Sequence, residues 1–185
     1  MELKGERLLA ADRAAAWVAL NDIDMLKSCI PGCESIVAVG ENQFEIALMA
    51  AVGPVKARFK GKMALVDIDQ PNAYTMKFDA SGGPTGFARG EVRVTLVEES
   101  PRQTRLSYVA DAQIGGKLAQ VGSRLIDAAA GATADKFFEA FGAQLAARAA
   151  PAAEAGVAPV QPVAPVRIGF FSLLLAFLKR LFGSR

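Results

Sequence analysis

Two cysteines four residues apart are the first side chains in this sequence that could do chemistry. Cys29 and Cys33 flank a Pro-Gly pair. A disulfide across this spacing is geometrically possible, but thiols stay reduced in the cytoplasm, and the spacing is not that of a CxxC redox motif. Two thiolates also leave a metal shell incomplete. We therefore expect both cysteines at packing or turn positions, and no metal site.

Histidine, the commonest general base, does not occur anywhere in the 185 residues. Its absence removes the protease-type serine and cysteine dyads and nearly every catalytic zinc site. An enzyme built on this chain would have to use carboxylates, Tyr74, Tyr108 or basic side chains, and no paired carboxylates stand out at inward positions. We therefore predict no catalytic residue and a protein that is not an enzyme. A cyclase or hydratase is the enzymatic alternative.

Basic residues alternate along one segment of the chain. In a strand their side chains would share one face, opposite Ala57 and Phe59, because successive side chains point to opposite faces. An ordinary solvated outer face and a docking surface for an acidic partner or anionic lipid both fit this pattern. The candidates for partner docking are Lys56, Arg58, Lys60 and Lys62.

Charge is unevenly distributed along the chain. Residues 1–148 carry 17 basic and 18 acidic side chains, whereas residues 149–185 carry four basic and one acidic. The balance in the first segment argues against nucleic acid as a partner. Charged residues in the opening MELKGERLL leave no room for the apolar region of a secretory signal, so we expect a cytoplasmic domain.

The first thirty residues predict a strand followed by two short helices. Residues 2–9 can form the strand. Asp12 is a suitable N-cap for a helix that ends near Asn21, and either Asp22 or Asp24 could cap the second helix. Pro31-Gly32 would end that helix.

From Glu34 to Asp111 the hydrophobic period is two, which indicates consecutive antiparallel hairpins. Turn signals separate the strands at 40–42, 53–54, 70–72, 82–84 and 100–101. Each apolar set should cover one concave face of the sheet. The sets are Phe44, Ile46 and Leu48; Val55, Ala57 and Phe59; Tyr74, Met76 and Phe78; Val92, Val94 and Leu96; and Leu106, Tyr108 and Ala110.

Residues 117–148 have the longest helical pattern, which predicts one helix that covers the sheet. Its middle, AAAGATA at 128–134, has almost no side-chain bulk. Such residues fit close helix–sheet packing or a space beneath the helix equally well, and both interpretations stay open. The folded domain is predicted to span residues 1–148.

The remaining sequence predicts a linker and a membrane-binding tail. Residues 149–166, rich in Ala, Pro and Val, favour extended geometry, and 18 residues at about 3.1 Å each could reach roughly 55 Å. Residues 167–185 contain only eleven consecutive uncharged residues, and a spanning helix needs about 20, so we expect an interfacial amphipathic helix. The expected membrane-binding residues are Phe170, Phe171, Leu174, Leu175, Leu178, Lys179, Arg180, Leu181 and Phe182.

With these segments placed, residues 1–145 resemble the family of the carbon monoxide dehydrogenase G-subunit, within the START-like, polyketide-cyclase-like superfamily. Four blocks carry the resemblance: DMLKSCIPGCESI at 24–36, GPVKARFKGKM at 53–63, GFARGEVRVTL at 86–96 and GGKLAQVGSRLIDAAAGATADKFFEAF at 115–141. The resemblance implies an α+β helix-grip fold. In that fold a curved antiparallel seven-stranded sheet is wrapped around a long C-terminal helix, and two short helices follow strand one.

The resemblance also implies a function. Similar proteins accompany molybdenum-containing dehydrogenases, attach them to the inner face of the cytoplasmic membrane and supply a quinone as electron acceptor in respiratory electron transfer. We therefore expect no covalent cofactor but a bound quinone, menaquinone or ubiquinone, or another isoprenoid lipid. The alternative is a recruiter that anchors the dehydrogenase without a ligand.

The ligand candidates are chosen physically, because the family motifs provide no catalytic residue. They are the inward strand positions Leu48, Phe59, Met76, Phe78 and Tyr108, and the helix positions Val121, Gly122, Leu125 and Ala129. A quinone headgroup would need a hydrogen-bond donor, which Tyr108, Ser123 or Arg124 could supply if oriented inward.

Overall fold

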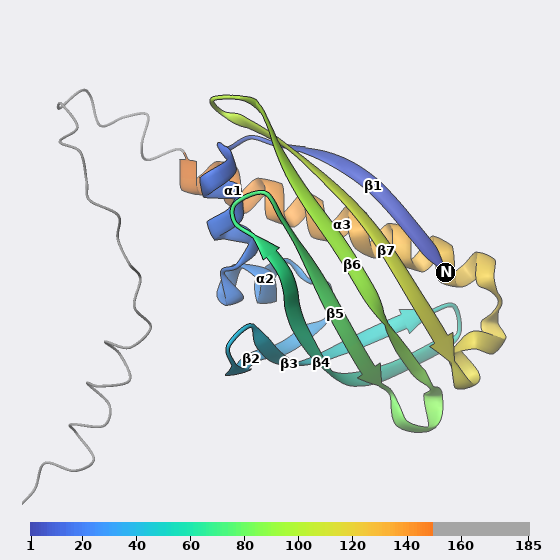
Figure 1. Ribbon diagram of the computed structural model, residues 1–185. Helices are drawn as coiled ribbons and strands as arrows, with labels where there is room; N and C mark the ends of the chain where they lie inside the picture. The colour runs from blue at the N-terminus through green and yellow to red at the C-terminus, as the bar shows by residue number, and fades with distance from the viewer. Residues whose placement is uncertain (150–185) are drawn as a thin grey trace, which may run out of the picture. The chain divides into compact units, whose positions relative to one another are not determined.

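A seven-stranded sheet and one long helix dominate the computed structural model, which describes residues 1–149 (Figure 1). The chain forms β1 (Glu2–Leu9), α1 (Arg13–Leu20), α2 (Ile23–Cys29), β2 (Cys33–Gly40), β3 (Gln43–Val52), β4 (Val55–Asp69), β5 (Ala73–Ser81), η1 (Gly83–Thr85), β6 (Phe87–Ser100), β7 (Gln103–Gly115), η2 (Gly116–Val121) and α3 (Ser123–Ala149). The predicted strand–helix–helix–strands–helix order is confirmed.

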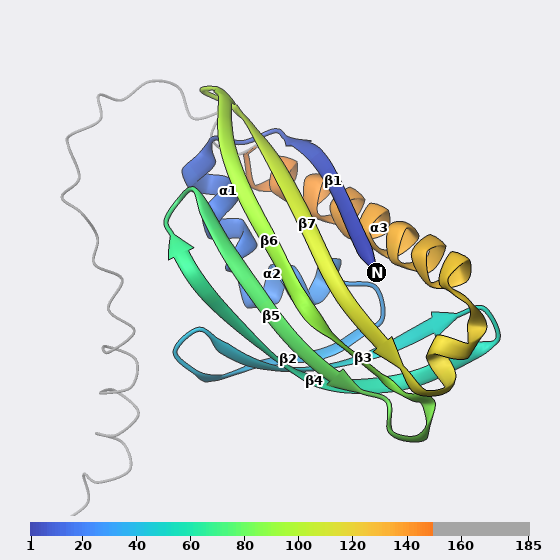
Figure 2. The same cartoon turned by 45° about the vertical axis from the view of Figure 1, so that its right-hand side comes forward.

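The strands form a meander in which every neighbouring pair is antiparallel. Their order is β1-β7-β6-β5-β4-β3-β2, so β1 and β2 are the edges. The sheet curves around α3, and α1 and α2 lie near the C-terminal half of that helix (Figures 1 and 2). We call the face of the sheet toward α3 the inner face, and the opposite one the outer face.

Strand register places the predicted apolar sets together on the inner face. Residues opposite each other in neighbouring antiparallel strands share a face. Leu48 pairs with Phe59, and Tyr74, Val94 and Tyr108 form one row across three strands. The period-two interpretation of these strands is therefore correct.

Carboxylate caps define both short helices, as expected. The Asp12 side chain accepts a hydrogen bond from the Ala15 amide at 2.8 Å, and that of Asp22 accepts one from the Met25 amide at 3.0 Å. Asp22, rather than Asp24, is therefore the cap of the second helix. These caps help to position α1 and α2, whose apolar sides are buried.

The long helix begins later than the hydrophobic pattern predicts. Residues 116–121 form the short 3-10 helix η2, and α3 starts at Ser123. Between them Gly122 has φ +95°, a conformation that side chains with a Cβ rarely adopt, and this breaks the helical path. The prediction of one continuous helix from residue 117 is therefore wrong at its N-terminal end.

The main core lies where α1, α2 and the C-terminal half of α3 meet the sheet. Phe141 is fully buried, and Trp17 packs edge-on against Tyr74 with ring centroids 5.6 Å apart. The other large buried side chains of this cluster include Leu9, Leu20, Met25, Leu96, Leu106 and Leu145. This half of the interior is filled by large side chains.

The predicted linker and tail lie outside the described residues, apart from Ala149, the last residue of α3. Among residues 1–149, none of the helices has the length and apolarity needed to cross a membrane.

Candidate functional site

The half of the inner face farther from α1 and α2 is lined by small or only half-buried side chains. One row across the sheet is formed by Ile46, Gly61, Ala80, Ala88 and Ile114. The next is formed by Phe44, Met63, Phe78, Gly90 and Ala112. All of these except Ile46 remain partly exposed, although they point toward α3. We call these two rows the low-bulk zone.

The adjoining part of α3 is equally poor in side-chain volume. Since η2 follows β7 directly at Gly115, α3 begins at the end of the sheet where the low-bulk zone lies. Ala129, Ala130 and Ala134 are half-buried, and a Cβ added to Gly131 would meet no atom within 4 Å beyond its own helix. Small residues on both sides explain why inward side chains here keep accessible surface.

The predicted strand ligands all lie on the inner face, but not in equal environments. Leu48, Met76 and Phe78 are half-buried, whereas Phe59 retains 5% of its exposure. Tyr108 is also buried, and its ring stacks on Phe138 with centroids 5.3 Å apart. Tyr108 therefore belongs to the filled core, and the row of Met76, Val92 and Ala110 separates it from the low-bulk zone.

The predicted helix ligands are less well grouped. Ala129 and Val121 are half-buried, but Gly122 is exposed, and Leu125 has a relative solvent accessibility of 49%. Ser123 and Arg124, the alternative headgroup donors, are exposed as well. The break at Gly122 accounts for this, because the side chains before and after it do not follow one helical stripe.

Sequence reasoning missed the small residues that give the low-bulk zone its character. Ala80, Ala88, Gly90 and Ala112 come from three different strands, and only the register brings them together. Alternation alone could have identified Ala80, two residues after Phe78, but it does not reveal that its neighbours are also small.

Burial favours the neutral forms of Tyr74 and of the two cysteine thiols. Burial raises the pKa of Tyr74 to about 12, and it also raises the pKa of the Cys29 and Cys33 thiols. Both cysteines are free, Cys29 buried and Cys33 half-buried. Cys29 occupies a packing position, as expected, whereas Cys33 is the first residue of β2 rather than part of a turn.

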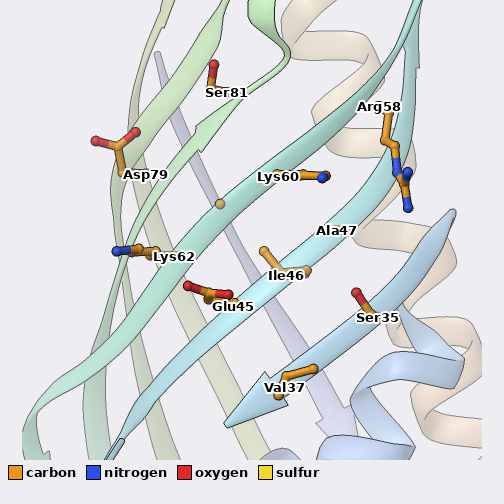
Figure 3. Close-up of a pocket in the computed structure, with 11 residues that line it drawn as sticks. Ser35, Val37, Glu45, Ile46, Ala47, Arg58, Lys60, Lys62, Asp79 and Ser81 are labelled. Atoms are coloured by element: carbon orange, nitrogen blue, oxygen red, sulfur yellow. The ribbon is translucent and has the colours of Figure 1, made fainter. Parts of the chain in front are cut away.

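A second feature is an open hollow of about 680 Å³ on the outer face of β2–β5 (Figure 3). It is lined by Ser35, Val37, Glu45, Ile46, Ala47, Arg58, Lys60, Gly61, Lys62, Asp79 and Ser81. Three of the four basic residues singled out in the sequence line it, and none of the predicted ligand residues does. It opens on the outer face, and Ile46 and Gly61 are the two residues of the low-bulk zone that also line it.

The basic residues differ in their neighbours. Arg58 pairs with Glu34 at 2.5 Å, and Lys62 lies opposite Glu45 and Asp79 in the register. The cross-strand neighbours of Lys60 are Ala47 and Ser81, which carry no charge. Lys60 is therefore the cation in the hollow whose positive charge is least compensated by its cross-strand neighbours.

Comparisons with known proteins agree with this architecture. The model of the CoxG family, described as the G-subunit of carbon monoxide dehydrogenase, matches residues 5–146. A solved structure of a conserved protein from Geobacillus kaustophilus is 28% identical, with a TM-score of 0.75 over 80% of this chain and 96% of that one. Among curated proteins, none matches.

More distant solved structures share the fold. A START superfamily protein from Mycobacterium smegmatis is 12% identical with a TM-score of 0.62, over 80% of this chain and 98% of that one. The Zhui aromatase/cyclase from Streptomyces sp. R1128 is 14% identical with a TM-score of 0.60, over 85% and 99%. The helix-grip START-like fold expected from the sequence is confirmed.

Proposed function

The chain belongs to the CoxG family, that of the carbon monoxide dehydrogenase G-subunit, and we propose that it is an accessory protein of a molybdenum-containing dehydrogenase of that type. In this proposal it binds an apolar, quinone-like lipid between the inner face of the sheet and α3. It carries this lipid between the membrane and the enzyme as electron acceptor. It is not itself the catalyst.

The observation that carries the proposal is the low-bulk zone. Six of its ten inward positions are Ala, Gly or Met, and the half of α3 that begins at this end of the sheet carries Ala129, Ala130 and Gly131. The zone contains no charged side chain, which favours an apolar ligand over an anionic one. An isoprenoid chain would bury apolar surface that is accessible there. Each Å² removed from water would contribute about 25 cal/mol to the binding free energy.

Menaquinone and ubiquinone combine such a chain with a redox-active ring. Tyr108, an inward hydroxyl one row away from the zone, is our candidate donor to the quinone carbonyl. The proposed ligand contacts are Leu48, Phe59, Met76, Phe78, Val121 and Ala129, while Gly122 and Leu125 would lie at the periphery.

The tail and linker supply the proposed membrane attachment. Residues 167–185 combine bulky apolar side chains with four basic residues and no acidic one. Basic residues near an anionic surface contribute about 1 kcal/mol each. We propose that this segment lies in the inner leaflet interface and that residues 149–166 act as the tether.

Native mass spectrometry of the full chain, purified from a host that makes quinones, tests ligand carriage. We expect a mass increment that organic extraction identifies as menaquinone or ubiquinone, at close to one per chain. An unliganded protein from such a host, with no extractable isoprenoid, would contradict the proposal.

The outer hollow favours a second candidate, a recruiter that docks the dehydrogenase without a ligand. Lys60 offers a cation to an acidic partner surface. Lys60→Glu should then weaken binding to the co-purified dehydrogenase at least tenfold in an interferometry titration, because like charges would meet. Lys77→Glu, an exposed charge reversal on the same face but outside the hollow, is the matched control.

A further inference from the structure

Three segments that are far apart in the sequence meet at the end of the sheet where the low-bulk zone lies. They are the β3–β4 turn, the η1 loop and the η2–α3 junction (Figure 1). Leu125 reaches the turn, because its Cδ1 lies 3.5 Å from the position that a Cβ would occupy if Gly53 carried a side chain. The backbones of Gly86 and Gly116 also touch closely. We call residues 52–56, 82–89 and 115–127 together the tip.

The tip exposes large apolar side chains. Leu125 retains 49% of its exposure and Phe87 38%, and Pro54 is also exposed. Phe87 is fixed in place, because its ring covers Gly115 and the Arg89 guanidinium lies 5.4 Å from its centroid. Exposed apolar side chains interspersed with cations are typical of surfaces that enter a lipid interface.

The charge of the tip has one predominant sign. Its four cations are Lys56, Arg89, Lys117 and Arg124, and its one carboxylate is Asp127. The other end of the molecule, formed by α1, α2, the remaining hairpin turns and the end of α3, is acidic. Its charged residues are Asp12, Asp22, Asp24, Glu41, Asp67, Asp69, Glu98 and Glu99, against Arg13, Lys27, Arg102 and Arg148. An anionic bilayer would therefore attract the tip and repel the opposite end.

The tip also adjoins the proposed lipid site. The η1 loop follows Ser81, next to Ala80, and precedes Ala88, so it closes the end of a low-bulk row. Gly82 lies against the ring of Phe59, one of the candidate ligand contacts. A lipid that left the bilayer at the tip would reach the low-bulk zone without crossing the filled core.

The tether is long enough to permit this orientation. Arg148, near the end of α3, pairs with Asp22 at 2.8 Å, so the described chain ends at the acidic end. The 27-residue α3 is about 40 Å long at 1.5 Å per residue, and the linker could reach roughly 55 Å.

We propose that the tip is a second membrane contact, built into the folded domain, that presses the mouth of the lipid site onto anionic headgroups. This proposal rests on the proposed function, because it assigns the orientation in which the lipid enters. The tip cations bind phosphate headgroups, and Leu125, Phe87 and Pro54 enter the acyl boundary.

Amide hydrogen–deuterium exchange of the full chain tests the contact directly. The probes are vesicles of phosphatidylcholine alone and vesicles that also contain phosphatidylglycerol. We expect exchange in residues 52–56, 82–89 and 115–127 to slow on the mixed vesicles and to remain unchanged on phosphatidylcholine alone. This readout needs no quinone, so it is independent of ligand carriage.

A matched pair of double variants adds the functional consequence. Arg89→Gln with Lys117→Gln removes two tip cations, each worth roughly fivefold on anionic lipid, so the tip contact should weaken about 30-fold. In this variant the tip amides should lose their protection from exchange on the mixed vesicles, and the extraction of quinone from vesicles should slow. The affinity for quinone in detergent should stay unchanged. Lys27→Gln with Arg102→Gln makes the same charge change at the acidic end and should have no effect.

Two results would overturn the proposal. In one, the protein binds the mixed vesicles while exchange in the tip stays the same, so the tail alone makes the contact. In the other, the dehydrogenase without vesicles protects the tip, which would assign it to an acidic protein surface. Failure of quinone carriage would be recognised separately, by the absence of extractable lipid.

Discussion

Single small residues decide whether the interior of this domain is filled. Ala88 lies on the inner face, opposite Ala80 on one side and Ile114 on the other, and all three are half-buried. The same alanine in a filled core would have little surface left. The state of the space around Ala88 therefore distinguishes a lipid carrier from a recruiter with a packed interior.

Ala88→Leu tests this difference. If the space is open, three added carbons become buried and the free energy of unfolding should rise by about 2 kcal/mol, while the bound isoprenoid falls several-fold. In a filled core the same change would instead destabilise the protein by about 1–3 kcal/mol. Chemical unfolding and lipid extraction measure the two effects.

The control for this variant is Thr95→Leu, on the exposed outer face of the same strand. This variant should change the unfolding free energy by less than about 0.5 kcal/mol, and it should leave the amount of extracted lipid unchanged. A clear loss of stability in Ala88→Leu alone would favour the recruiter.

At the scale of elements, the capping carboxylate of α2 links the short helices to α3. The Met25 amide and the Arg148 guanidinium both bond to Asp22, and together they lower the pKa of its carboxyl group below 3.8. A lowered pKa in the folded state means that the charged carboxylate stabilises the fold. This contribution is complete above the ordinary pKa and is lost as pH falls through the lowered one.

Asp22→Ala should therefore reduce the free energy of unfolding by about 1 kcal/mol at neutral pH, the usual value of a lost N-cap. The difference from the unmodified protein should shrink as the pH falls below 4, because the cap is then protonated in both folded and unfolded chains. Urea unfolding at neutral and acidic pH measures it. Asp24→Ala, an exposed acidic neighbour that does not cap the helix, should cost less at every pH.

At the scale of the whole molecule, two features are proposed to contact the bilayer. One is the tail, a continuous segment of the sequence at residues 167–185, and the other is the tip, a surface that the folded domain forms from three separate segments. Each alone would bind weakly and reversibly, since stable attachment usually takes two signals. With the proposed tether between them, the second contact becomes intramolecular and the combined affinity rises without any new interaction.

Phe171→Glu with Leu175→Glu tests the tail. Two carboxylates among the apolar side chains of residues 167–185 should abolish most flotation of the full chain with anionic vesicles, because each charge would have to leave water. Val160→Glu with Val163→Glu, the same change in the linker, should leave flotation nearly unchanged. Equal flotation of the tail variant and the unmodified chain would argue against the membrane-binding role of the tail.

Local chemistry in the sequence was sufficient to predict much of the fold. Alternating apolar residues and turn signals such as Gly53-Pro54 specify strands and hairpins, and the carboxylate of Asp12 specifies a helix start, since each acts over a few residues. For the second helix the sequence left Asp22 and Asp24 open, and the structure shows Asp22. The inward direction of Leu48, Met76 and Phe78 follows from the same period of two.

Only the tertiary structure decided what those elements enclose and expose. The break at Gly122 depends on how η2 turns away from β7, so a hydrophobic pattern that runs through it could not reveal it. The low-bulk zone, the hollow around Lys60 and the tip each combine residues from several strands or loops, and their juxtaposition depends on strand register and sheet curvature. Sequence patterns act between near neighbours, whereas these sites arise from contacts between distant ones.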